Sequence, residues 1–278
     1  MTPRWTSPLT GSVVYEADAS LVAATLPAGC ASLAILDGPY GMGKAAWDKV
    51  PRGGTLADLY QGHLDDVGRV CAASASLYLW NTSAGWAELH PHILARGWTF
   101  RSLIVWDKVA PPLTLPDYWP NVIEVCAQYG RGDEQFAHPA HSPRRHSGDH
   151  VPAVTCVWRL APGAYLGERL KSGERARARD GSQVDESLHP CQKPLLFAER
   201  MIRASSRPGD LVWAPFGGTL REMVAAERMA RLDPAEARRV VTCELNQDGR
   251  DYIGAALEQI GAEVRPVAGQ VGLFGGGR

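Results

Sequence analysis

The segment Leu36-Asp37-Gly38-Pro39-Tyr40-Gly41-Met42-Gly43-Lys44 directly follows the compact apolar run of residues 32–36. Such a run is typical of a strand buried in a parallel sheet. In α/β proteins, ligands bind beyond the carboxyl ends of such strands. Both the fold and the function of the chain therefore depend on how this polar, glycine-containing loop is interpreted.

Strand and helix patterns alternate on both sides of this loop. Strands are expected at 12–15, 32–36, 76–80, 100–106, 121–128, 211–213 and 240–243, and helices at 19–26, 56–73, 86–96, 194–206, 219–232 and 250–260. The chain contains no internal repeat of 20 to 50 residues, which excludes solenoids and propellers. This alternation predicts an α/β fold, a mostly parallel sheet with helices on both faces.

The pattern weakens in the middle of the chain. Between residues 131 and 188 the apolar periodicity fades, four histidines fall among Pro, Ser and Arg, and residues 171–179 are locally basic. We predict an inserted segment, either a subdomain or a long loop, at 131–188. It divides one domain into a first part at 1–130 and a second part at 189–278.

One interpretation of the loop is a phosphate-binding site, because Gly38 to Lys44 satisfies the G-x-x-x-x-G-K pattern of P-loop nucleotide hydrolases. Two features weaken it. Position 45 is Ala, so the hydroxyl that holds Mg²⁺ is missing, and Pro39 removes a backbone N–H from a loop that must offer N–H groups.

A second interpretation comes from motifs found in order along the chain. Asp37-Gly38-Pro39-Tyr40 resembles the Asp-Pro-Pro-Tyr motif of DNA methyltransferases that modify exocyclic amino groups. His189-Pro190-Cys191-Gln192-Lys193-Pro194 resembles their His-Pro-(Thr/Ser)-Gln-Lys-Pro motif, and Ala214-Pro215-Phe216-Gly217-Gly218-Thr219 their Asp-Pro-Phe-x-Gly-x-Gly-Thr loop. A catalytic motif that precedes the cofactor motif resembles the β class, whose sheet is circularly permuted, so a Rossmann-like methyltransferase fold is implied.

The resemblance implies methyl transfer from S-adenosylmethionine to adenine N6 or cytosine N4 of a flipped base in double-stranded DNA. It assigns Asp37, Gly38, Pro39 and Tyr40 to catalysis: the Asp37 carboxylate and the Gly38 carbonyl accept the amine protons, and Tyr40 stacks on the base. The residues implied for the cofactor are Asp18, His189, Gln192, Lys193, Pro215, Phe216, Gly217, Gly218, Thr219, Glu244 and Asn246. Among them, Glu244 is expected at the ribose hydroxyls and Lys193 near the methionine carboxylate.

The sequence departs from the family pattern at several positions. Gly38 replaces the first Pro, which is expected to loosen the catalytic loop, and Cys191 replaces Thr or Ser. Ala214 stands where the family has Asp, and the glycine loop is expected to be about two residues shorter than the motif. A catalytically impaired DNA-binding relative is therefore an alternative.

DNA contact is expected from basic residues in and beside the insertion: Arg131, Arg144, Arg145, Lys171, Arg175, Arg177 and Arg179. A solvated charged surface is the alternative for these residues. His138, His141, His146 and His150 have irregular spacings, so no metal site is expected.

Composition limits the remaining possibilities. The chain has 278 residues, 45% of them apolar, and 29 Lys plus Arg against 30 Asp plus Glu, a net charge of −1. This excludes a disordered chain, while the basic balance typical of nucleic-acid binders is absent over the chain as a whole. Six well-separated cysteines exclude a zinc ribbon, and no membrane segment is apparent, so a cytoplasmic location without membrane contact is expected. The resemblance also allows a homodimer and a cognate restriction endonuclease as partners.

Overall fold

The computed structural model of the chain describes residues 1–43, 48–50, 52–108, 119, 121–137, 154–160, 171–177, 183–187, 191–245 and 250–264. No helix of these residues is both long and apolar enough to cross a membrane.

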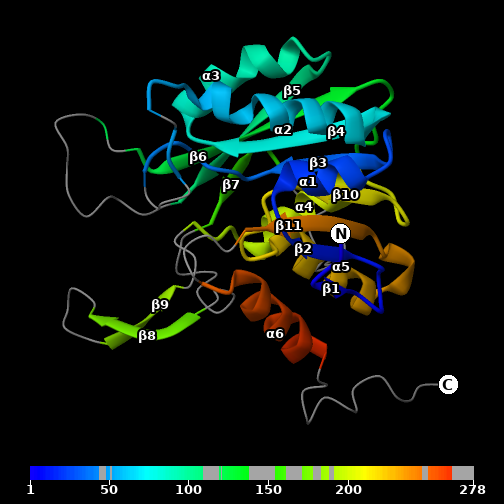
Figure 1. The fold of residues 1–278 in the computed structure, drawn as a ribbon, viewed down its shortest axis with the longest axis vertical. Helices are drawn as coiled ribbons and strands as arrows, with labels where there is room; N and C mark the ends of the chain where they lie inside the picture. The colour runs from blue at the N-terminus through cyan, green and yellow to red at the C-terminus, as the bar shows by residue number, and fades with distance from the viewer. Residues whose placement is uncertain are drawn as a thin grey trace, which may run out of the picture.

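A sheet of nine strands forms the centre of the molecule (Figure 1). Its spatial order is β1-β2-β11-β10-β3-β4-β6-β5-β7. Strands β1 and β6 run antiparallel to their neighbours, and the other pairs are parallel. The strands are β1 (Trp5–Thr6), β2 (Val13–Glu16), β3 (Ala31–Leu36), β4 (Cys71–Asn81), β5 (Thr99–Asp107), β6 (Ile123–Arg131), β7 (Val157–Arg159), β10 (Leu211–Ala214) and β11 (Arg239–Glu244).

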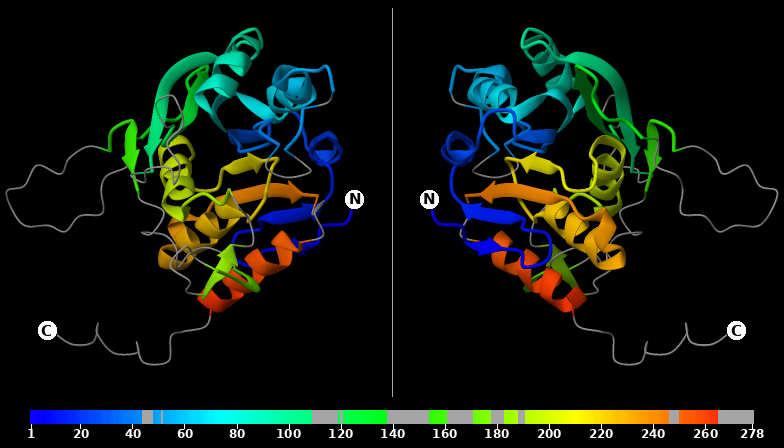
Figure 2. Two further views of the ribbon diagram at one scale, coloured as in Figure 1. Left: turned by 90° about the vertical axis from the view of Figure 1, so that its left-hand side faces the viewer. Right: turned by 90° about the vertical axis from the view of Figure 1, so that its right-hand side faces the viewer.

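Helices cover both faces of this sheet, as predicted. One layer contains α1 (Ala19–Thr25), α2 (Leu56–Val70) and α3 (Ser83–Leu94), and the other contains α4 (Leu195–Ser205), α5 (Arg221–Leu232) and α6 (Tyr252–Val264). A short 3₁₀ helix, Pro234–Glu236, precedes β11. Figure 2 shows α1 and α2 (blue) on the opposite side of the strands from α4 and α5 (yellow).

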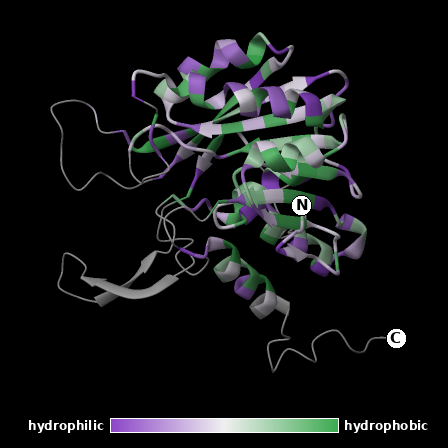
Figure 3. Cartoon of the chain, in the orientation of Figure 1, coloured by the Kyte–Doolittle hydropathy of each residue, from purple (hydrophilic) through white to green (hydrophobic). Residues whose placement is uncertain are grey.

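The core follows the two-residue period of the strands. In β3 and β4, Leu33, Ile35, Tyr78 and Trp80 pack on the α4–α5 side, whereas alternate residues such as Leu36 pack on the α1–α2 side. Figure 3 shows the central strands dominated by hydrophobic residues, with hydrophilic residues on the outer side of α3. Both faces of the sheet are therefore buried, which explains the continuous apolar runs in the sequence.

The pairing of β3 with β10 joins the two halves of the sequence. Leu33 pairs with Val212 and Ala34 with Trp213 in parallel register. Because parallel strands end at the same edge of a sheet, the loops that follow β3, β10 and β11 lie next to one another. The sheet therefore brings the 37–40 motif and the 214–219 motif together.

The structure differs from the sequence prediction at several elements. The predicted helix 56–73 ends at Val70 instead, and residues 71–73 begin β4, in which Cys71 pairs with Ala31 and Ala75 with Arg131. The predicted insertion at 131–188 is not uniform: β7 joins the edge of the main sheet beside β5. Strands β8 (Lys171–Arg177) and β9 (Gln183–Ser187), which were not predicted, form a separate antiparallel sheet.

Candidate active site

A cavity of about 280 Å³ lies at the carboxyl edge of the sheet, between the two halves of the sequence. Asp37 enters it as the first residue after β3. Tyr40 and Lys193 line it near Asp37, whereas Gly218 and Glu244 contribute from the loops after β10 and β11. Residues that are far apart in the sequence thus share one site.

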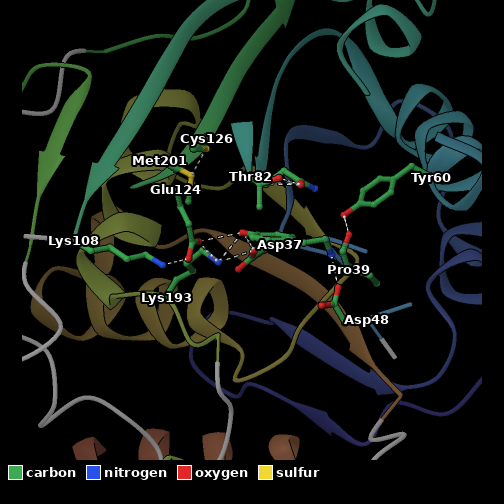
Figure 4. Close-up of polar contacts among 12 residues, drawn as sticks. Asp37, Pro39, Asp48, Tyr60, Thr82, Lys108, Glu124, Cys126, Lys193 and Met201 are labelled. Atoms are coloured by element: carbon green, nitrogen blue, oxygen red, sulfur yellow. Dashed lines mark hydrogen bonds and ion pairs between the residues drawn. The ribbon is translucent and has the colours of Figure 1, made fainter. Parts of the chain in front are cut away.

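Asp37 is held through one of its two carboxylate oxygens (Figure 4). Oδ1 accepts a hydrogen bond from the Tyr40 hydroxyl at 3.0 Å and one from Lys193 Nζ at 2.9 Å. No residue of the described chain donates a hydrogen bond to Oδ2. The carboxylate is therefore oriented, while one oxygen stays available to a ligand.

A chain of alternating charges extends from Asp37. Lys193 Nζ lies 3.2 Å from Glu124 Oε2, and the other Glu124 oxygen accepts from Lys108. Glu124 is part of β6 and Lys108 directly follows β5, so three strand ends hold this arrangement. Sequence analysis missed Glu124, although a charged residue in the otherwise apolar segment 122–127 was a usable signal.

These contacts fix the protonation states. Burial by itself would lower the pKa of Lys193, but the Asp37 and Glu124 carboxylates raise it. Burial would raise the pKa of Glu124, but Lys193 and Lys108 lower it to about 2. Burial raises the pKa of Asp37, and Lys193 offsets only part of that shift. Glu124 and Lys193 therefore stay charged at neutral pH, and Asp37 is more basic than an exposed aspartate.

Asp48 fixes the backbone of the loop that follows β3. Its Oδ1 accepts hydrogen bonds from the backbone N–H groups of Tyr40 at 2.7 Å and Gly41 at 2.8 Å, and its side chain is buried. Gly41 has φ +72°, a conformation that glycine adopts without strain. Sequence analysis missed Asp48 because nothing in the local pattern marks a residue that reaches back eight positions.

Gly38 tightens the loop rather than loosening it. A Cβ at this position would lie 2.6 Å from the Tyr60 hydroxyl and 2.7 Å from the Phe216 ring. The Tyr60 hydroxyl also donates to the Pro39 carbonyl at 3.1 Å. The expected loosening is therefore wrong: glycine stands here because Tyr60 and Phe216 occupy the space that a proline ring would need.

The second half of the cavity is formed by the loops after β10 and β11. Gly218 N donates to Glu244 Oε2 at 2.7 Å, and a Cβ on Gly217 would meet the Cys243 carbonyl at 2.9 Å. The Phe216 ring packs against His63 and Tyr60, with ring centroids 4.8 and 5.9 Å away. Pro215, Gln192 and Thr219 line the same cavity, as does Asp18, which also caps α1 through Ser20 N.

The glycine loop leads into α5 through a leucine in the left-handed conformation. When Ala214 is placed on the motif's Asp, the eight positions run to Arg221 without a gap, and Leu220 takes the place of the second Gly. Leu220 has φ 53° and ψ 38°, and it is the one non-glycine residue of the described chain with positive φ. A buried leucine thus adopts the left-handed conformation here, and the shorter loop stays a prediction.

Arg131 does not lie near this site. It pairs with Ala75 at the opposite edge of the sheet, donates to the carbonyls of Gly68, Cys71 and Ala72, and covers the Trp98 ring. A guanidinium committed to three backbone carbonyls is explained by the fold, so we withdraw Arg131 from the DNA-contact prediction.

Several predicted residues lie outside the described part of the chain, or have only their backbone described. Outside it are His189, Asn246, Arg144, Arg145 and Arg179, together with Lys44 of the phosphate-loop alternative. Strand β8 carries Lys171, Arg175 and Arg177. Lys193, predicted at the cofactor carboxylate, lines the cavity but bonds to Asp37 and Glu124 instead.

A family model described as DNA methylase, covering N6 and N4 amino-methyltransferases, matches residues 31–262. The chain belongs to the N6/N4 DNA methylase family. This membership leaves the phosphate-loop alternative without support, and it agrees with the order of the 37–40 and 214–219 motifs.

Individual members of the methylase family resemble the chain over most of its length. The type II methyltransferase M1.MboII of Moraxella bovis is 24% identical over 239 residues, 82% of this chain and 89% of that protein. The DNA adenine methyltransferase YhdJ of Escherichia coli K12 is 23% identical and covers 89% of this chain and 82% of its own length.

Solved structures of the methylase family share the fold. The PvuII cytosine-N4-specific DNA methyltransferase superposes with a TM-score of 0.65 at 15% identity, over 94% of this chain and 93% of that one. A putative DNA modification methylase of Thermus thermophilus, complexed with S-adenosyl-L-methionine, gives a TM-score of 0.54 at 18% identity, over 90% and 93%. The chain thus has the Rossmann-like fold of class-β methyltransferases.

Proposed function

We propose that this methylase transfers a methyl group from S-adenosylmethionine to the exocyclic amino group of a flipped adenine or cytosine in double-stranded DNA, with Asp37 as its central catalytic residue. The observation that carries the proposal is the orientation of Asp37. Its Oδ1 is held by Tyr40 and Lys193, no described residue donates to its Oδ2, and Asp37 lines a cavity shared by both halves of the fold.

The reaction needs activation of a poor nucleophile. The lone pair of an aryl amine is delocalised into the ring, and acceptors aimed at its N–H groups localise that pair on nitrogen. Asp37 Oδ2 is one such acceptor. The resemblance to the family motif implies that the Gly38 carbonyl is the second, and the neighbouring Pro39 carbonyl accepts from Tyr60. As the nitrogen–carbon bond forms and the carbon–sulfur bond breaks, one amine proton is released toward Asp37, whose raised pKa suits it as an acceptor.

The cofactor fits the second half of the cavity. When bound, S-adenosylmethionine supplies a methyl group on a positively charged sulfur. Gly217 and Gly218 line this part of the cavity. Glu244, which accepts from the Gly218 N–H, is the residue that we assign to the ribose hydroxyls. Asp18, Gln192 and Thr219 add polar groups on the same wall, and the Phe216 ring adds an apolar one. Acidic and glycine-rich groups at this edge suit a cationic nucleoside.

We assign Tyr40 to the orientation of Asp37, whereas the sequence motif implied that it stacks on the base. Its hydroxyl bonds to Asp37, burial raises its pKa well above the ordinary value, and Lys193 Nζ lies 5.1 Å from its ring centroid. Tyr40 is therefore a neutral donor that orients Asp37, and stacking of a base on its ring stays a prediction. DNA contact by β8, a homodimer and a partner endonuclease stay predictions as well.

The test is incorporation of labelled methyl groups into duplex DNA, followed by mass spectrometry of the nucleosides to identify the modified base. Wild-type protein is expected to label DNA, and Asp37→Ala is expected to abolish labelling while it still binds S-adenosylmethionine. Asp65→Ala, which removes a surface partner of Arg96 on α2, serves as the control. Near-normal labelling by Asp37→Ala would overturn the catalytic assignment.

A further inference from the structure

Glu222 is a buried carboxylate that the catalytic arrangement does not use. It lies in the first turn of α5, directly after the glycine loop, and its exposed fraction is 8%. It lines the same cavity as Asp37, Gly218 and Glu244. In the family motif, the corresponding segment follows a Gly-Thr pair, whereas here Leu220 and Arg221 precede Glu222.

The Glu222 carboxylate has no partner side chain within the described residues. No ion pair joins it to a described Lys, Arg or His. The one hydrogen bond that affects its pKa comes from its own backbone N–H. Burial raises its pKa to about 7, and Asp37 adds to this shift, whereas Arg221 and Lys193 reduce it. Buried carboxylates are rare without a partner, because removal from water is costly for the charged form.

The nearby cations are already engaged. Lys193 lies between Asp37 and Glu124, and the Arg221 guanidinium donates to the Thr219 carbonyl and to Gln259 Oε1 at 2.6 Å. Cys126 of β6 is buried, and burial together with the nearby Glu222 charge raises the pKa of its thiol, which is therefore neutral. Glu222 thus lines the cavity as a carboxylate that has no ion-pair partner among the described residues, and Arg221 and Lys193 offset its charge only in part.

We propose that Glu222 binds the positively charged methionine end of S-adenosylmethionine. This inference rests on the proposed cofactor site. The ligand carries a sulfonium and an α-ammonium group, and a carboxylate at a buried wall attracts such a charge far more strongly than one in water. Glu244 then contacts the sugar of the cofactor, and Glu222 contacts its amino-acid end.

The experiment compares three ligands by isothermal titration calorimetry. S-adenosylmethionine carries both cationic groups, S-adenosylhomocysteine keeps only the ammonium, and 5′-methylthioadenosine has neither. At pH 7.5, Glu222→Gln is expected to weaken S-adenosylmethionine binding by about 10- to 100-fold and to leave 5′-methylthioadenosine binding unchanged. A parallel loss for S-adenosylhomocysteine assigns the contact to the ammonium, and an unchanged value assigns it to the sulfonium.

Glu227→Gln is the matched control. Glu227 is a buried glutamate of the same helix, but it bonds to Thr10 and lies 3.9 Å from Arg231, away from the cavity. Its variant is expected to bind all three ligands like the wild type. An equal loss of 5′-methylthioadenosine binding in Glu222→Gln would show a change in cavity shape and overturn the proposal.

A pH series gives a second readout. Because only ionised Glu222 attracts a cation, wild-type affinity for S-adenosylmethionine is expected to rise between pH 6 and 7.5 more steeply than that of Glu222→Gln. Asp37, Lys193 and Arg221 are common to both proteins, so the difference isolates Glu222. Identical affinity and pH dependence in the two proteins would overturn this inference alone. A wild-type protein that binds none of the three ligands would overturn the proposed function as well.

Discussion

Lys193 Nζ lies 2.9 Å from Asp37 Oδ1, although the two residues are 156 positions apart in the sequence. The contact couples the two motifs that define the family in this chain. Lys193, which was predicted to bind the cofactor, instead contacts the carboxylate that we propose as catalytic. The charges of Glu124 and Lys108 complete the arrangement, so the basicity of Asp37 depends on residues from the ends of β6 and β5 and from the segment before α4.

The first prediction concerns Glu124. Glu124→Gln removes a negative charge that raises the pKa of Asp37, and Asp37 is then the one ion-pair partner of Lys193 among the described residues. The pKa of Asp37 therefore falls, and the carboxylate becomes a weaker acceptor. We expect kcat to fall about 10- to 100-fold and the acidic limb of the kcat–pH profile to move to lower pH. Steady-state kinetics across pH measures both. Glu134→Gln, which breaks a pair with Arg101 at the opposite edge of the sheet, is expected to change neither.

The second prediction concerns the catalytic loop. Asp48→Ala removes the acceptor of two backbone N–H groups, which loosens the segment that carries Asp37 and Tyr40. A fall in kcat of about 10-fold or more is expected from misplaced groups, with S-adenosylmethionine affinity largely retained. Asp48→Asn keeps one acceptor oxygen and should retain most of the activity. Equal activity of the alanine variant and the wild type would contradict the role of Asp48.

The third prediction concerns the stability of the ligand-free protein. The pKa of Glu222 is raised from 4.5 to about 7 in the folded state, so folding favours its protonated form. Its ionisation therefore lowers stability progressively as the pH rises from about 4.5 to 7, by up to about 3 kcal/mol. Glu222→Gln should unfold at about the same temperature as the wild type at pH 5 and at a higher temperature at pH 8. Thermal unfolding at both pH values measures this, and Glu227→Gln, which loses real partners, should be less stable at both.

The fourth prediction concerns DNA contact by strand β8. If Arg175 and Arg177 contact phosphates, the double change to alanine weakens binding to duplex DNA and reduces the slope of log K against log salt by about 2. Fluorescence anisotropy at several salt concentrations measures the slope. Arg96→Ala, which removes a surface pair with Asp65 just before β5, should leave it unchanged. A double variant with the wild-type slope would mean that these arginines are part of a solvated charged surface and do not contact DNA.

The sequence predicted the part of the fold that is coded locally. The apolar runs of β3, β4, β10 and β11 and the amphipathic helices between them follow from periodicity, and the motifs placed Asp37 and Gly218 at one edge of the sheet. Pairings between distant strands carry no local signal, so the antiparallel insertion of β6 and the position of β7 were not predicted.

The site was predicted less completely than the fold. Glu124 and Asp48 both accept hydrogen bonds from Tyr40, although they lie 84 and 8 positions away from it in the sequence. No motif includes residues at these separations. The effect of Gly38 was misjudged because the neighbours that fill its space, Tyr60 and Phe216, come from other elements. Leu220 was missed since leucine seldom adopts a left-handed conformation, and a residue pattern cannot show that it does so here.

The pairing of β10 with β3 also has a consequence for biosynthesis. The centre of the sheet needs a strand from the first fifth of the chain and one from its last third, so its contacts are strongly non-local. A nascent chain that has not yet released residues 211–244 from the ribosome lacks the neighbour of its catalytic strand and the glycine loop. The cavity that both segments line therefore forms only after β10 and β11 have been synthesised, and a chain interrupted before β10 lacks it.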